Sequence, residues 1–219
     1  MDEFEEIFEQ PKDKSFVLTV VGRRGSGKTT LLMQILCRMG LLEVYDKVYI
    51  FSPNWRFDPS YKAYMSIAKR KDGQTLEVYE TYSSETIDNI FDTAKPESEE
   101  KILIIIDDCI SEKGFKKVGS SDAQARLSNS GRNRKISLIV VSQNCNSIHA
   151  DVRRNSSFII CFKCDNRNEQ IALYNSYGWG KPNDWIDWLQ KQTTEKHSAI
   201  CLSQEAHDRL EFAKIIKLK

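Results

Sequence analysis

The sequence lacks any apolar run near the roughly 20 residues that a membrane-spanning helix needs, and it is poor in histidine and cysteine. Its 219 residues include three histidines and six cysteines. The irregular cysteine spacing disfavours a disulfide framework, and Cys161-x-x-Cys164 lacks the second pair or the nearby histidines that a zinc site requires. The acidic start, residues 1–6, resembles neither a secretory signal nor a transit peptide. We therefore expect a soluble, intracellular protein with reduced thiols.

A strong net charge is also missing. Lys and Arg number 32 and Asp and Glu 31, which gives a formal net charge of +1. No global basic field therefore favours nucleic acid, and contact with a polyanion must come from a local cluster or from a small cluster repeated in an oligomer. Repeats and low-complexity tracts are absent too. The length fits one domain over residues 16–219, preceded by a flexible acidic arm at residues 1–15.

What the sequence does contain is a phosphate-binding motif, because Gly22-Arg23-Arg24-Gly25-Ser26-Gly27-Lys28-Thr29 fits G-x-x-x-x-G-K-[ST]. It lies between a strand-like apolar run at residues 16–21 and a helix-like run at 30–39, which argues against a chance match. The backbone N–H groups of residues 25 to 29 are expected to surround a phosphate at the helix N-terminus. Lys28 would reach the β- and γ-phosphates and Thr29 would bind Mg²⁺. The predicted nucleotide-binding residues are Gly22, Arg23, Arg24, Gly25, Ser26, Gly27, Lys28, Thr29 and Thr30.

Buried strands alternate with helices along the rest of the chain. The run Ile102-Leu103-Ile104-Ile105-Ile106 predicts a central parallel strand covered on both faces. Further strands are expected at 47–51, 75–79, 136–142 and 158–162, with a final edge strand at 197–202, and helices at 60–70, 84–93, 121–130, 166–177 and 183–191. This pattern predicts an α/β P-loop NTPase with a mostly parallel central sheet covered by helices on both faces.

Two aspartates and a glutamine follow the apolar strands, at the edge where open α/β sheets bind ligands. Asp107 is predicted to hold Mg²⁺ through water, and Asp108 to polarise the attacking water as a general base. A pair of helix-capping acids is the alternative. Gln143 could sense the γ-phosphate or orient water, or it could be a solvated amide in a turn.

Arginines crowd the segments that flank the strand before Gln143. A guanidinium inserted beside the transferred phosphoryl group stabilises its charge, and in a ring it comes from the neighbouring subunit. Taken singly, each is more simply a solvated surface charge, and spacing does not say which one serves as the finger. The arginines in these segments are Arg126, Arg132, Arg134, Arg153 and Arg154, and the finger is expected among Arg132, Arg134, Arg153 and Arg154.

Two further segments allow two interpretations each. The loop 112–117 carries Lys113, Lys116 and Lys117 and could touch a phosphate backbone in a ring pore without reading bases, or be a solvated charged loop. The aromatic residues at 174–188 favour a core or subunit contact over a base-stacking platform.

The order of these segments resembles the genome-packaging ATPases of large eukaryotic DNA viruses, including poxviruses, and of virophages, within the FtsK–HerA superfamily. The likeness runs from about residue 16 to residue 174. Its specific part is the Gly131-Arg132 turn leading to Gln143, followed by Arg153-Arg154-Asn155 and the strand at 158. The resemblance implies a RecA-like ATPase of the ASCE type that forms a ring, usually a hexamer, and pumps double-stranded DNA into a preformed capsid.

The resemblance also implies roles, partners and a location. The cofactors would be ATP and Mg²⁺, a capsid or vertex protein would be a further partner, and the site of action would be the host-cell cytoplasm, a viral factory or the virion. Viral members often have Asp at the position of Asp108, where cellular pumps favour Glu. Carried over by position, the functional residues are Lys28, Thr29, Asp107, Asp108, Gln143, Arg132, and Arg153 or Arg154.

Other functions fit the residues less well. A GTPase switch needs an N/T-K-x-D motif, which the sequence lacks. A P-loop nucleotide kinase would need an arginine-rich lid over a monomeric site, and the acid pair with Gln143 argues against it. A cellular HerA-like pump in repair or plasmid transfer remains the alternative within the motor class.

Overall fold

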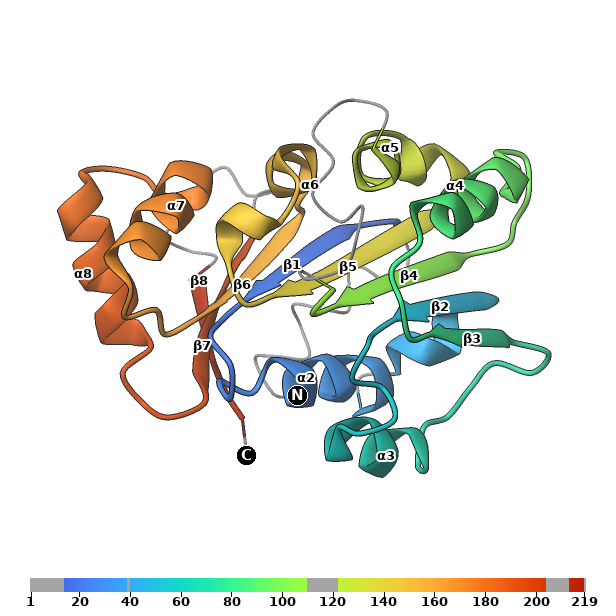
Figure 1. Cartoon of the computed structure of the whole chain (residues 1–219), viewed down its shortest axis with the longest axis horizontal. Helices are drawn as coiled ribbons and strands as arrows, with labels where there is room; N and C mark the ends of the chain where they lie inside the picture. The colour runs from blue at the N-terminus through green and yellow to red at the C-terminus, as the bar shows by residue number, and fades with distance from the viewer. Residues whose placement is uncertain (1–13, 39, 110–121, 204–212, 219) are drawn as a thin grey trace.

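The structure, a computed structural model, describes residues 14–38, 40–109, 122–203 and 213–218. An eight-stranded sheet in the order β3-β2-β4-β5-β1-β6-β7-β8 runs through these residues, as Figure 1 shows. The six strands from β3 to β6 are parallel, whereas β7 and β8 each run antiparallel to the preceding neighbour. The strands are β1 Val17–Val21, β2 Lys47–Phe51, β3 Thr75–Tyr79, β4 Ile102–Asp107, β5 Ile136–Ser142, β6 Phe158–Phe162, β7 Ser198–Ser203 and β8 Ala213–Lys217.

Helices cover both faces of this sheet (Figure 1). One face carries α2 Lys28–Met33, its π-helical continuation Gln34–Arg38, a 3₁₀ turn Leu41–Val44 and α3 Pro59–Met65. The other carries α4 Ser84–Thr93, α5 Ala123–Ser130, α6 Ala150–Asn155 and α7 Arg167–Tyr177, with α8 Pro182–Gln192 packed beside α7. Two short 3₁₀ turns, Gly131–Arg134 and Cys145–Ser147, flank β5. The predicted α/β class is confirmed.

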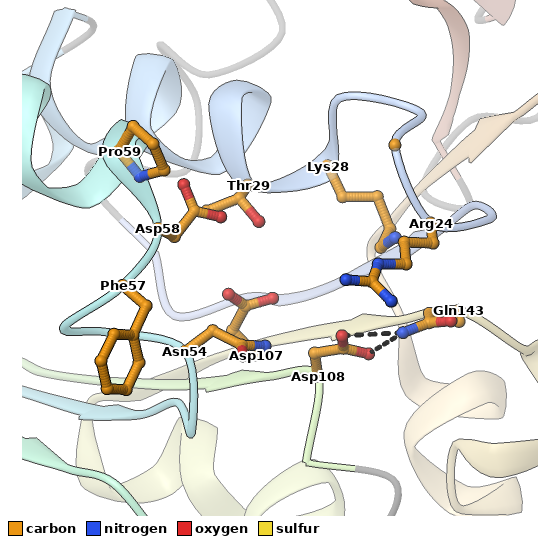
Figure 2. A pocket seen from close by; sticks show the side chains of 11 residues that line it. Arg24, Lys28, Thr29, Asn54, Phe57, Asp58, Pro59, Asp107, Asp108 and Gln143 are labelled. Carbon is orange, nitrogen blue, oxygen red and sulfur yellow. Dashed lines mark hydrogen bonds between the residues drawn. The ribbon is translucent and has the colours of Figure 1, made fainter.

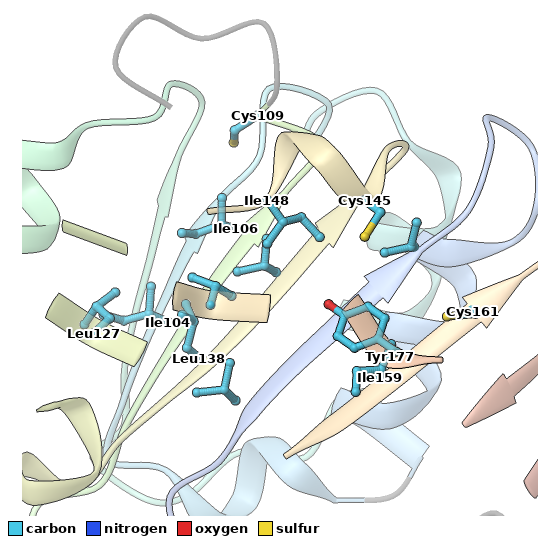
Figure 3. Packing of buried hydrophobic residues seen from close by; sticks show 14 of the residues in the cluster. Ile104, Ile106, Cys109, Leu127, Leu138, Cys145, Ile148, Ile159, Cys161 and Tyr177 are labelled. Carbon is cyan, nitrogen blue, oxygen red and sulfur yellow. The ribbon is translucent and has the colours of Figure 1, made fainter. Parts of the chain in front are cut away.

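The strand β4 shows why the sheet needs two helical layers. Its side chains alternate between faces, so Ile104 and Ile106 join the core beneath α4, α5 and α6, seen in Figure 3. Leu103 and Ile105 join the opposite core, which contains Tyr61 of α3 and the apolar side of α2. Each of these β4 side chains is fully buried, as the unbroken apolar run predicted.

Two predicted elements differ from the structure. The strand predicted at 197–202 as a final edge strand is β7, and it does not lie at the edge, because β8 pairs with it over residues 213–217. The sequence of β8, Ala-Lys-Ile-Ile-Lys, is short and contains two lysines, yet Ile216 is only 2% exposed. The helix expected at 60–70 ends at Met65. Within the described residues, no helix has the length and apolar character to cross a membrane.

Candidate nucleotide-binding site

The carboxyl ends of β1, β4 and β5 meet at one edge of the sheet, because β5 lies between β1 and β4. Loops that leave these strands, together with the loop after β2, surround a cavity of about 590 Å³ (Figure 2). Three carboxylates and two basic side chains line it, a balance that suits a polyphosphate bridged by a cation. The lining residues are Arg24, Gly25, Lys28, Thr29, Asn54, Phe57, Asp58, Pro59, Asp107, Asp108 and Gln143.

The phosphate-binding loop has the backbone that its glycines predict. Gly25 has a φ of 75° and Gly27 a φ of 104°, a region that side-chain-bearing residues rarely adopt. Lys28 is only 7% exposed, and its ammonium donates a hydrogen bond to the Arg23 carbonyl oxygen at 3.0 Å. Burial lowers the pKa of Lys28, while the carboxylates of Asp108 and Asp107 oppose that shift.

The other loop residues lie around the cavity without lining it. The Arg23 guanidinium pairs with Asp165 at 2.7 Å on the surface. The Thr30 hydroxyl contacts Ser60 Oγ of α3 at 3.2 Å, away from the cavity. Ser26 presents its carbonyl oxygen to His197 Nδ1 at 3.1 Å. The outer side of the loop therefore contacts the residue that precedes β7, across a separation of 171 residues that no sequence motif predicts.

Asp107 closes β4 with its carboxylate almost buried, at 2% exposure. One oxygen, Oδ2, accepts a 2.6 Å hydrogen bond from the Tyr61 hydroxyl, and the other, Oδ1, is buried without a partner in the described residues. Burial raises the pKa of Asp107 to about 6, and Asp108 adds to the rise, while the Tyr61 hydrogen bond and Lys28 act against it. An orphaned, ionisable oxygen beside Thr29 suits the predicted role at a hydrated Mg²⁺.

The structure brings Asp108 and Gln143 together, as their places after neighbouring strands predict. Gln143 Nε2 donates to both carboxylate oxygens of Asp108, at 2.9 and 2.8 Å (Figure 2). Asp108 adopts a left-handed backbone with a φ of 56°, and its N–H donates to the Val141 carbonyl at 3.0 Å. A non-glycine residue held in this region is strained, and such strain is commonest at functional sites.

The loop between β2 and α3 forms a wall of the cavity that none of the predicted motifs includes. Asn54, Phe57, Asp58 and Pro59 all face it (Figure 2). Asp58 caps α3 by accepting from the Ser60 N–H at 2.8 Å, and the D-P pair is a helix-start signal that could have located this turn. Phe57 is 80% exposed.

The arginines proposed as fingers lie outside this chain's cavity, whose described lining includes a single arginine, Arg24. Arg132 donates to Ser157 Oγ at 2.6 Å, at the amino end of the strands. Arg153 donates to the Ile148 carbonyl at 3.2 Å and to Ser176 Oγ at 2.6 Å, joining α6 to α7.

The other two finger candidates, Arg134 and Arg154, also contact groups of their own chain. Arg134 donates to the Phe91 carbonyl at 3.2 Å and also to that of Ala94. Arg154 pairs with Asp151 but keeps its side chain 74% exposed. The roles of these arginines between subunits stay predictions, and the proposed pore loop at 112–117 lies outside the described residues.

The sequence matches the model of one protein family, described as Poxvirus A32 protein, over residues 3–199. The chain belongs to the poxvirus A32 protein family. A search of the curated proteins finds no match. Family membership confirms the predicted resemblance to the packaging ATPases of poxviruses and related viruses.

Solved structures share the fold of this A32 family member. B204, the DNA-packaging ATPase from Sulfolobus Turreted Icosahedral Virus, superposes with a TM-score of 0.68 at 14% identity, over 93% of this chain and 98% of that one. The genome packaging NTPase B204 of Sulfolobus turreted icosahedral virus 2, in complex with ATP-gammaS, gives 0.63 at 16% identity, over 93% and 97%. The cytoplasmic domain of the Thermomonospora curvata Type VII secretion ATPase EccC gives 0.58 at 13% identity, over 94% of this chain and 24% of that one.

At identities this low, the structural likeness establishes the shared P-loop ATPase fold. Combined with membership of the A32 family, it supports the predicted assignment of this chain as a viral genome-packaging ATPase.

Proposed function

We propose that this A32 family member hydrolyses ATP·Mg²⁺ and uses the energy to move double-stranded DNA into a viral capsid. The observation that carries the proposal is the content of one cavity: a phosphate-binding loop with Lys28, an aspartate with an open oxygen, and the Asp108–Gln143 pair. These are the parts that ATP hydrolysis needs, held at the ends of adjacent strands. The packaging role is supported by the family and by the shared fold with B204, a DNA-packaging ATPase.

The residues present fit a Mg²⁺ ion that accompanies the nucleotide. Thr29 and Asp107 both line the cavity, and Asp107 Oδ1 is a buried acceptor that finds no partner among the described residues. When bound, Mg²⁺ would neutralise charge on the β- and γ-phosphates. Thr29 would hold it through its hydroxyl and Asp107 through water.

Asp108 is the general base in this proposal, and Gln143 holds its carboxylate. Both oxygens of Asp108 accept from Gln143, so the amide fixes the carboxylate plane while one lone pair of each oxygen stays available to water. Lys28 would bind the β- and γ-phosphate oxygens. Together they place a water, a base and a cationic anchor around the γ-phosphate.

The arginine that completes the site would come from a neighbouring subunit of a ring, expected to be a hexamer. Arg154 is the candidate that exposure favours, since 74% of its side chain is accessible. Double-stranded DNA would pass through the ring and be held by its backbone, and a capsid or vertex protein would receive the motor in the host cell.

The test is steady-state ATP hydrolysis measured with and without long double-stranded DNA across a range of protein concentration. A rate per subunit that rises with concentration and with DNA is the expected result, because a shared site needs a neighbour. Lys28→Ala should abolish turnover, and Arg154→Ala should bind ATP but lose the rise. A rate indifferent to concentration and DNA would refute the motor and favour a self-contained ATPase.

A further inference from the structure

The geometry points to Tyr61 as a positioning residue that aims the Asp107 carboxylate at the Mg²⁺ of the nucleotide. This inference rests on the proposed function, since it assigns a role within the same site. Tyr61 belongs to α3, not to any nucleotide-binding motif, and it reaches Asp107 from 46 residues away. It does not touch the nucleotide itself in this proposal.

The Tyr61 side chain is held rigidly. Only 1% of it is exposed, and its ring packs against Trp55 with a centroid distance of 4.5 Å. It also belongs to the apolar core between α2 and the sheet. The ring therefore has little freedom to rotate, and its hydroxyl occupies a fixed point behind the cavity.

That fixed hydroxyl selects one orientation of Asp107. A carboxylate at a strand end can rotate about its last torsion, which is broad for aspartate. The 2.6 Å hydrogen bond from Tyr61 holds Oδ2 on the core side, so the unpartnered Oδ1 is the oxygen left for the ligand. Figure 2 shows the Asp107 carboxylate directed toward the part of the cavity where Thr29 lies.

The first turn of α3 is tied to the phosphate-binding helix as well. Asp58 caps this turn through the Ser60 N–H, and Ser60 Oγ contacts Thr30 Oγ1 of α2 at 3.2 Å. One helical turn thus sets the distance between Thr29, which precedes Thr30, and Asp107. Groups that orient a metal-binding carboxylate are typically worth 10- to 100-fold in metal affinity or activity.

A purely structural tyrosine would give the same burial, so the test needs a matched control. Tyr45 supplies it: it is 2% exposed and its hydroxyl donates to Ser137 Oγ at 2.8 Å, at the opposite end of the strands. Tyr61→Phe and Tyr45→Phe each remove one buried hydroxyl and keep the ring. Both should lower the melting temperature, Tyr45→Phe by about 2 to 4 °C and Tyr61→Phe by at least as much, because its hydroxyl donates to a buried carboxylate.

Only Tyr61→Phe should change the response to Mg²⁺. Binding of a fluorescent ATP analogue is measured by anisotropy, first in EDTA and then across a Mg²⁺ titration, and hydrolysis is followed over the same titration. We expect Tyr61→Phe to need about tenfold more Mg²⁺ for half-maximal binding enhancement and turnover. Its affinity in EDTA should equal that of the wild type, and turnover should recover at high Mg²⁺.

An unchanged Mg²⁺ midpoint in Tyr61→Phe, or an equal shift in Tyr45→Phe, would overturn the inference. This outcome is separable from failure of the proposed function. In that second case the wild type itself would show no Mg²⁺-dependent hydrolysis, whatever residue stands at position 61.

Discussion

The two ends of the same parallel strands follow opposite rules. At the carboxyl ends, Asp107 has a buried oxygen with no partner in the part of the chain that the structure describes, and Asp108 adopts a left-handed backbone. At the amino ends, polar side chains form hydrogen bonds that join segments far apart in the sequence. Ser137 of β5 accepts from both the Phe16 N–H at 3.2 Å and the Tyr45 hydroxyl at 2.8 Å.

The arginines repeat this contrast. Arg132 and Arg134 at the amino ends are tied to Ser157 and to the carbonyls that end α4, whereas Arg24 at the carboxyl ends lines the cavity. Polar groups that are satisfied internally stabilise a fold, and polar groups held ready for a ligand cost stability. The stabilising polar contacts therefore lie at the amino ends of the strands, and the residues for ligand binding lie at the carboxyl ends.

Among changes that test this difference between the two ends, Asp108→Asn should have the largest effect on ATP turnover. Removing the general base should lower turnover about 100-fold, while Lys28 and the loop keep their hold on ATP. The checks are single-turnover hydrolysis and equilibrium binding of an ATP analogue. Gln143→Asn is a useful companion, because it keeps the amide but shortens its reach to Asp108. Normal turnover by Asp108→Asn would remove that residue from the mechanism.

Replacing Asp107 should increase the stability of the metal-free protein, although it removes a residue that the activity needs. Its pKa rises from 3.8 to about 6 in the folded, metal-free protein, so the folded state keeps a proton that the unfolded chain loses near pH 4. The contribution of Asp107 to the free energy of unfolding is therefore most favourable below about pH 4. It falls by up to about 3 kcal/mol as the pH rises through about 6.

Asp107→Asn should consequently stabilise the protein in EDTA at pH 7.5 by about 1 to 3 kcal/mol, and lose Mg²⁺-dependent hydrolysis. Thermal unfolding between pH 4.5 and 7.5 measures the effect, and the gain should shrink toward the acid end. A variant that is less stable than the wild type at pH 7.5 would mean that Asp107 is not penalised by burial.

The contrast also explains which parts of the site could be predicted. Asp107, Asp108 and Gln143 lie at the ends of apolar strands, and Lys28 begins the helix that follows the phosphate-binding loop after β1. Parallel pairing brings these strand ends to one edge, and all four side chains line the same cavity. The contact of His197 with Ser26 spans 171 residues, and that of Tyr61 with Asp107 spans 46. Such contacts arise from how layers pack, which local patterns do not specify.

The same reasoning applies to the fold. The strand β4 was predictable because an unbroken apolar run has few other stable environments than a doubly covered sheet. The strand β8 was not, because its five residues, Ala-Lys-Ile-Ile-Lys, include two lysines and show no regular alternation, so the segment is short and polar enough to be taken for a tail. Its assignment depends on pairing with β7, and pairing partners are set by tertiary structure.

The smallest expected effect comes from the amino ends, with Arg134→Ala. This change removes hydrogen bonds to the carbonyls of Phe91 and Ala94 and a guanidinium 4.6 Å from the centroid of the Phe91 ring. We expect a loss of about 1 to 2 kcal/mol in the free energy of unfolding, measured by urea denaturation. ATP turnover per folded subunit, with DNA present, should stay at the wild-type level, since the contacts of Arg134 within the described residues lie outside the cavity of its own chain. A turnover that fell while stability held would place Arg134 in a neighbour's site, and the amino ends would then serve the chemistry of the next subunit.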